Sequence, residues 1–185
     1  MRYLVFIISF AALSSCSKKT YVFKDIDTGV QLGGNNIVIA DRDLGAERPE
    51  AKGEYFTWKQ ARKACPEGYH LMTAREAEAI IADRRYNSSG KLVLGELKLV
   101  MGGYGKQMGK KEGYKKKEYK FFNVGNWADY HLYEEYDKQR SWYLSFDIAG
   151  DFFGLDYMTK KDLLSVRCVK DPAPSADSYR FNGQE

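Results

Sequence analysis

The stretch "FTWKQARKACPEGYHLMTAREAEAI", residues 56–80, decides the fold predicted for this chain. Each of two helical patterns in it opens with Thr and carries Gln or Glu three residues later: Thr57 with Gln60, and Thr73 with Glu76. In such a capping box the Thr oxygen accepts a hydrogen bond from an unpaired backbone N–H, and the Gln or Glu side chain reaches back to the cap. The sequence therefore predicts helices at residues 57–65 and 73–86.

Outside these helices the chain shows short strand patterns. They are "NNIVIADR", "ELKLVMGGY", "YKFFNVG", "WYLSFDI", "DFFGLDY" and "LLSVRCV", at residues 35–42, 96–104, 119–125, 142–148, 151–157 and 163–169. In the last pattern Leu164, Val166 and Cys168 alternate with Ser165 and Arg167, as in a strand with one buried face. The predicted class is α+β, with two helices on a twisted, mainly antiparallel sheet that has long loops.

The first residues have the features of a bacterial lipoprotein signal peptide. Arg2 precedes an apolar run at residues 3–13, which is too short to cross a bilayer as a helix, because that takes about 20 residues. The run ends in Leu-Ser-Ser-Cys, which is similar to the lipobox whose cysteine is acylated. We expect a signal peptide at residues 1–15 and a lipidated Cys16 that begins a tether ending at residue 20. An ordinary cleaved signal peptide is the alternative.

The rest of the chain is typical of one folded domain. The formal net charge is +4 over 185 residues, which is nearly balanced, and no nucleic-acid partner is expected for an exported lipoprotein. An aromatic content of 15% argues against disorder. We predict a domain at residues 21–171 and a flexible tail at residues 172–185.

The three cysteines are divided between two roles. Lipidation of Cys16 would leave Cys65 and Cys168 as an even pair in a compartment where disulfides persist. The expectation is a disulfide between these two, and the alternative is two buried free thiols.

Several blocks carry a family resemblance. The quoted stretch resembles the Cys-Pro-x-Gly-Trp-His-Leu-Pro signature of the Fibrobacter succinogenes major paralogous domain, and "LGGNNIVIADRDLG", "GNWADY", "SWYLSFD" and "SVRCVKD" are similar to its other blocks. This chain departs from the signature at Tyr69, Met72 and Ala77, which concern packing. The resemblance covers roughly residues 30–171. It implies a C-type-lectin-like fold with a disulfide from an early helix to the last strand, hence between Cys65 and Cys168.

A calcium-dependent sugar site of the C-type-lectin kind is not expected. That site uses a Glu-Pro-Asn or Gln-Pro-Asp loop with Trp-Asn-Asp, since calcium needs several converging oxygens. This chain has no such Pro loop, and Trp127-Ala128-Asp129 keeps one carboxylate of the second piece. We predict no cofactor. A group of acidic residues has two interpretations, a solvated acidic face or a site for a structural calcium ion, and the solvated face is the simpler one. The residues are Glu134, Glu135, Asp137, Asp147, Asp151 and Asp156.

Catalysis is not expected either. The same broad fold includes the formylglycine-generating oxidase, which needs accessible, closely placed cysteines, whereas Cys65 and Cys168 match structural positions. His70 and His131 have no second His or Cys at metal-ligand spacing. His70 lies in the Cys-Pro-Glu-Gly-Tyr-His-Leu turn, where we expect a packing or hydrogen-bonding role.

Two segments are candidate binding surfaces. Residues 105–120 are rich in lysine: Lys106, Lys110, Lys111, Lys115, Lys116, Lys117 and Lys120. This segment is either a solvated loop that blunts a sheet edge or a docking patch for lipid phosphates, acidic glycans or an acidic protein. Residues 126–142 form a predicted loop whose tyrosines recur at three-residue steps beside charged residues. That candidate ligand surface consists of Tyr130, Tyr133, Tyr136, Glu134, Glu135 and Arg140, and the alternative places Trp127 and Trp142 in the core.

These observations predict a lipid-anchored cell-envelope protein with a non-catalytic binding domain for a glycan or an envelope protein. Ser17, in place of Asp, follows Cys16 and favours the outer membrane, with either face open. The alternatives are a structural or accessory lipoprotein without a ligand of its own, or an enzyme like the formylglycine-generating oxidase. The sequence identifies neither the ligand nor the oligomeric state.

Overall fold

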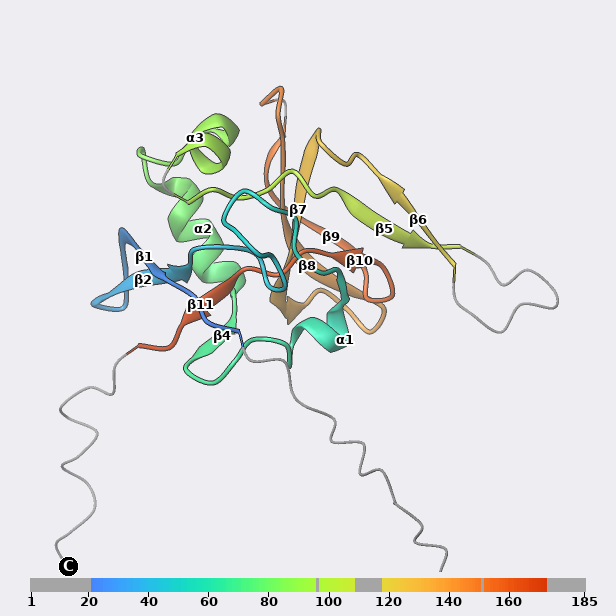
Figure 1. Ribbon diagram of the computed structural model, residues 1–185, viewed down its shortest axis with the longest axis horizontal. Helices are drawn as coiled ribbons and strands as arrows, with labels where there is room; N and C mark the ends of the chain where they lie inside the picture. Colours follow the sequence, from blue (N-terminus) through green and yellow to red (C-terminus); the bar gives the residue numbers. More distant parts are fainter. Residues whose placement is uncertain (1–20, 96, 109–117, 151, 173–185) are drawn as a thin grey trace, which may run out of the picture.

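A computed structural model describes residues 21–95, 97–108, 118–150 and 152–172 (Figure 1). The helices are α1 (Trp58–Ala61), α2 (Ala74–Ala82) and α3 (Ser89–Leu94). The strands are β1 (Asp25–Leu32), β2 (Asn35–Ala40), β3 (Phe56–Thr57), β4 (Tyr69–Leu71), β5 (Tyr104–Gln107), β6 (Tyr119–Phe122), β7 (Trp127–Glu135), β8 (Arg140–Asp147), β9 (Phe153–Thr159), β10 (Leu163–Leu164) and β11 (Cys168–Lys170). The predicted α+β class is confirmed. The predicted signal peptide, the lipidated Cys16, its tether and residues 173–185 of the predicted tail lie outside the described residues.

The strands form three small antiparallel sheets. Their orders are β1-β2-β11-β4, β3-β10-β5-β6 and β7-β8-β9. A parallel bridge between Tyr130 and Ser165 joins the third sheet to the segment between β10 and β11. In the described part of the chain, no helix is long and apolar enough to span a membrane.

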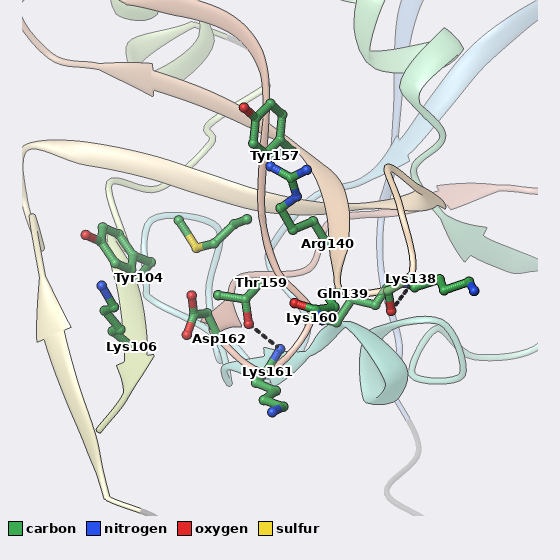
Figure 2. Close-up of a pocket in the computed structure, with 11 residues that line it drawn as sticks. Tyr104, Lys106, Lys138, Gln139, Arg140, Tyr157, Thr159, Lys160, Lys161 and Asp162 are labelled. Atoms are coloured by element: carbon green, nitrogen blue, oxygen red, sulfur yellow. Dashed lines mark hydrogen bonds between the residues drawn. The ribbon is translucent and has the colours of Figure 1, made fainter. Parts of the chain in front are cut away.

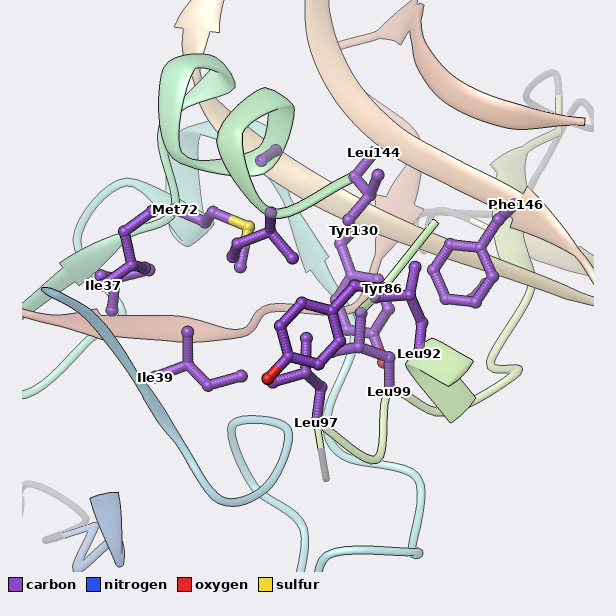
Figure 3. Packing of buried hydrophobic residues seen from close by; sticks show 14 of the residues in the cluster. Ile37, Ile39, Met72, Tyr86, Leu92, Leu97, Leu99, Tyr130, Leu144 and Phe146 are labelled. Carbon is purple, nitrogen blue, oxygen red and sulfur yellow. The ribbon is translucent and has the colours of Figure 1, made fainter. Parts of the chain in front are cut away.

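Helix α2 packs between the first and third sheets (Figure 1). Its buried Ala77 and Ile80 face a core that Ile39 and Val169 enter from the first sheet and Leu144 from the third. Figure 3 shows Tyr86 and Tyr130 among the buried aliphatic side chains of this cluster. A second cluster surrounds the cysteines. Burial on both sides of α2 thus holds two of the sheets together.

The capping-box predictions are confirmed at both helices. The backbone N–H of Thr73 donates to Glu76 Oε2 over 2.8 Å, and the N–H of Glu76 donates to Thr73 Oγ1 over 3.2 Å. At α1 the N–H of Thr57 donates to Gln60 Oε1 over 2.9 Å. Both helices are shorter than predicted, because α1 passes into turns before Cys65 and α2 ends before Asp83.

The expected disulfide is present. Cys65 and Cys168 are joined across a sequence separation of 103, with 5.8 Å between their Cα atoms. The bond ties the turns after α1 to β11, which lies between β2 and β4. It therefore fixes the first sheet to the helix that begins the quoted stretch.

The region after α2 differs from the prediction. A third helix that the sequence patterns did not predict follows α2, and Ser88 caps it, since its side chain accepts from the N–H of Lys91. The predicted strand at 96–104 is wrong over most of its length, because β5 begins at Tyr104. Leu97, Leu99 and residues 101–103 are buried without strand pairing, so the apolar pattern there reflects burial alone.

The predicted half-buried strand at 163–169 is also wrong. It divides into β10 and β11, which lie in different sheets, and both of its faces are buried. Arg167 is 0% exposed and its Nη2 lies 2.7 Å from Asp43 Oδ1. Its guanidinium also donates to the carbonyls of Ala40, Leu97 and Lys98 over 3.0–3.1 Å. Complete pairing lets the fold bury this charge.

Candidate functional site

Two grooves lie side by side where the β7–β8 hairpin, α1 and the β9–β10 turn meet. The Trp58 groove has a volume of about 750 Å³, and its lining residues are Thr57, Trp58, Lys59, Arg62, Lys63, Tyr133, Lys160 and Lys161. The Arg140 groove has a volume of about 680 Å³, and its lining residues are Tyr104, Lys106, Lys138, Gln139, Arg140, Tyr157, Met158, Thr159, Lys160, Lys161 and Asp162 (Figure 2). Both volumes suit a bound ligand. The two grooves share Lys160 and Lys161, so they form a continuous surface.

The shared turn is fixed on both sides by backbone hydrogen bonds. The N–H of Lys160 donates to the Gln139 carbonyl over 2.9 Å, and the Lys160 carbonyl accepts from the N–H of Trp58 over 3.3 Å. The Nζ of Lys160 also donates to the Asp137 carbonyl over 2.7 Å. Because these bonds hold Lys160, the adjacent exposed Lys161 projects from a defined position.

In the Trp58 groove a stack of side chains surrounds Arg62. Its guanidinium carbon lies 4.9 Å from the Trp58 ring centroid and 4.3 Å from that of Tyr133, and Nη2 donates to the Tyr133 hydroxyl over 2.7 Å. Trp58 is buried, and its Nε1–H donates to the Leu132 carbonyl over 2.9 Å. The buried indole thus positions an exposed cation at the floor of the groove.

A second aromatic cluster borders the Arg140 groove. The rings of Tyr136 and Tyr157 stack with centroids 4.1 Å apart, and Trp142 meets both edge-on. The Arg140 guanidinium lies 4.6 Å from the Tyr136 ring and 4.4 Å from the Tyr157 ring. Its Nη2 pairs with Asp137 over 2.7 Å. Figure 2 shows Arg140 extending toward Tyr157, with Tyr104 and Lys106 on the opposite wall.

The grooves are strongly cationic. Their basic lining residues are Lys59, Arg62, Lys63, Lys106, Lys138, Arg140, Lys160 and Lys161, whereas Asp162 is the single acid among their described lining residues. Burial raises the pKa of Asp162, which accepts from the Gln107 N–H. Lys160 pairs with Glu135 and Arg140 with Asp137, but the other six basic residues have no carboxylate within ion-pair distance among the described residues. The surface therefore favours an anion.

The predicted ligand surface is only partly correct in its geometry. Tyr130 is 1% exposed, so its place on an exposed row is wrong. The predicted loop is mostly strand, because β7 covers Trp127–Glu135 and β8 begins at Arg140. Tyr136 lies in the turn between them, and the register of β7 shifts between His131 and Glu135, so the tyrosines do not form one row. Tyr133 and Tyr136 are exposed: Tyr133 lines the Trp58 groove, whereas Tyr136 lines neither groove and stacks on Tyr157 of the Arg140 groove. Trp127 and Trp142 are half-buried.

The other predicted members of that surface have structural partners. Glu134 Oε2 accepts from the Ala74 N–H over 2.7 Å, at the start of α2. Glu135 lies 2.9 Å from Lys160. Arg140 is the one charged member that lines a groove.

The predicted lysine patch is described at two of its residues. Lys106 lines the Arg140 groove, and Lys120 lies across from it on β6. The remaining members, Lys110, Lys111, Lys115, Lys116 and Lys117, lie outside the described residues.

The histidines and the retained carboxylate have local partners. His70 Nε2 lies 2.9 Å from Glu76 and Nδ1 lies 2.7 Å from Asp171, so the predicted hydrogen-bonding role is confirmed. His131 is buried with its Nε2 2.7 Å from the Phe56 carbonyl. Asp129 is buried and accepts from Ser145 Oγ over 2.7 Å. Within the described residues, no three His, Cys, Asp or Glu side chains gather as metal ligands.

Sequence reasoning missed most of the groove. Trp58, Arg62, Lys160, Lys161 and Tyr157 carry it, and they come from two separate segments, residues 58–62 and 157–161. The available local signals were the four-residue spacing of Trp58 and Arg62 on a helix and the Lys-Lys pair between two strand patterns. Their proximity depends on pairings that no local pattern reveals.

Comparison with models of protein families, with curated proteins and with solved structures finds no match to this chain.

Proposed function

We propose that this chain is a lipid-anchored cell-envelope protein whose single domain binds a glycan or a protein partner and performs no catalysis. The observation that carries the proposal is the pair of grooves, where six cations without carboxylate partners among the described residues project beside exposed tyrosines. Ligand pockets combine such polar groups with aromatic walls. A C-type-lectin-like fold and membership of the Fibrobacter succinogenes paralogous domain family are part of the proposal, on the sequence resemblance alone.

The disulfide supports a binding function over catalysis by a reactive cysteine. Cys65 and Cys168 are joined to each other, which leaves neither as the free thiol that an oxidase of the formylglycine-generating kind requires. A glycan array probed with the full-length chain in detergent tests the proposal. Reproducible binding to one glycan class is the expected result. A blank array, together with no capture of envelope proteins, would favour a structural lipoprotein without a ligand.

The membrane anchor has a separate test. Replacing Cys16 by Ala removes the thiol that the lipid would modify, so the variant should accumulate as unprocessed or aqueous-phase protein while the parent partitions into detergent. Equal partitioning of both chains would argue against lipidation, and would leave the proposed binding role to be judged by the array.

A further inference from the structure

We propose that the two grooves form one extended site for a linear acidic polysaccharide, a chain of sugars that bear carboxylate, sulfate or phosphate groups. This inference rests on the proposed binding function and names its ligand class. The shared residues Lys160 and Lys161 make the grooves continuous, so a linear ligand can cross from one to the other. Two adjoining concave grooves favour an extended chain over a single small anion.

The charge arrangement favours an anionic polymer. Lys59 and Lys63 line the Trp58 groove, Lys161 lines both grooves, and Lys106 and Lys138 line the Arg140 groove. All five are exposed, and none has a carboxylate partner within ion-pair distance among the described residues. Cations spaced along a groove match charges that repeat along a polymer.

The neutral groups favour sugars over stacked bases. Single-stranded nucleic acid binds on open aromatic faces. Here Arg62 covers a face of Tyr133, and Tyr136 and Tyr157 stack on each other beside Arg140. The tyrosines therefore offer hydroxyl groups and ring edges, and Gln139 and Thr159 add hydrogen-bonding groups to the same walls. Sugar hydroxyls between the charges have partners in such a lining.

The concave shape also distinguishes the ligand from a membrane surface. A planar bilayer contacts projecting residues, whereas each groove also has a buried lining residue, Trp58 in one and Asp162 in the other, which a flat surface does not reach. A flexible chain of sugars can follow such a surface.

The test measures binding of the full-length chain in detergent to oligogalacturonates, as monomer, tetramer and octamer, with neutral dextran as the uncharged probe. We expect the octamer to bind more tightly than the monomer and to lose affinity as salt is raised. The variant Lys63→Gln/Lys161→Gln removes one cation that lines the Trp58 groove and one that lines both grooves. It should weaken octamer binding about tenfold, because two exposed ion pairs are lost.

The matched control is Lys24→Gln/Lys52→Gln, which removes the same charge from exposed lysines that line neither groove. The site is supported if the control variant binds the octamer about as tightly as the parent does, and if both variants melt at the same temperature as the parent. Equal weakening in both variants would show general charge attraction and overturn it. If oligothymidylate binds as tightly as the octamer, and Lys63→Gln/Lys161→Gln weakens both to the same extent, the ligand class would be nucleic acid and the polysaccharide proposal would be wrong. If the protein binds neutral glycans on the glycan array and both variants keep that binding, this inference would be refuted and the proposed function would stand.

Discussion

Asp129 shows how a single buried carboxylate makes stability depend on pH. It is 2% exposed, its Oδ1 accepts from Ser145, and its Oδ2 has no hydrogen-bond partner among the described residues. Burial, and to a lesser extent the nearby Asp156 charge, raises its pKa from 3.8 to about 6. The folded state therefore holds this proton more tightly than the unfolded state, and the free energy of unfolding falls as the pH rises through this range.

Replacing Asp129 by Asn should remove that dependence. Between about pH 4 and pH 8 the free energy of unfolding of the variant, relative to the parent, should increase by about 2–3 kcal/mol. Urea unfolding at a series of pH values measures this difference. Asp137→Asn is the control with the opposite sign: hydrogen bonds from Arg140 lower the Asp137 pKa below 3.8, so its contribution to stability should be lost only as the pH falls below about 4 and should be nearly constant between about pH 4 and pH 8. Parallel pH profiles for parent and Asp129→Asn would show that Asp129 does not titrate in this range.

Elements that carry a local signal were predicted from the sequence, and pairings between distant segments were not. Thr73 and Glu76 define a helix start within four residues, so the helix was found. Arg167 was assigned to a solvent face because an unpaired guanidinium is not buried. Its partner Asp43 lies 124 residues away in the chain, beyond any local pattern.

The candidate site divides in the same way. Tyr133, Tyr136 and Arg140 were found because aromatic and charged residues are dense in that segment. Strand β7 itself was missed, since it carries buried residues on both faces and lacks the alternation of a half-buried strand. Arg62 and Lys161 reach the site through the meeting of α1 with the β9–β10 turn, which is a tertiary property.

Tyr130 holds residues 97–103 in place, a segment that forms neither helix nor strand before Tyr104. Its hydroxyl accepts from the Val100 N–H over 2.6 Å and lies 3.2 Å from Asp43 Oδ2, so it holds residues 97–103 against β7. Tyr130→Phe would leave the Val100 N–H without this partner and should lower the free energy of unfolding by about 1–3 kcal/mol. Thermal or urea unfolding measures the loss, and ligand binding at the grooves should be unchanged.

Tyr133→Phe is the matched control, because it removes an exposed hydroxyl whose partner is Arg62. We expect its stability to differ from the parent by less than about 0.5 kcal/mol. A smaller loss for Tyr130→Phe than for Tyr133→Phe would contradict the role assigned to the buried hydroxyl.

At the scale of the whole molecule, the disulfide joins parts of the core that come from distant parts of the chain. Cys168 lies in the cluster that also contains Leu44, Ala61 and Leu71. Leu71 belongs to β4 of the first sheet, Leu44 to the loop that follows β2, and Ala61 to α1. Strand β3, which belongs to the second sheet, directly precedes α1 in the chain. The bridge therefore limits how far the first sheet can separate from α1 and the grooves when the fold opens.

Removing the bridge should destabilise the whole domain without abolishing its packing. For a closed loop of roughly 100 residues, the chain-entropy account gives about 4–5 kcal/mol, and measured effects are often smaller. We expect Cys65→Ala/Cys168→Ala to lower the free energy of unfolding by about 2–5 kcal/mol, and the parent under reducing conditions to approach the same value. The reduced parent separates loss of the bridge from loss of buried volume, because it keeps both side chains. In the single variant Cys168→Ala, the remaining Cys65 thiol should become alkylated on unfolding. Alkylation of both cysteines in the oxidised, unfolded parent would show that the bond does not form.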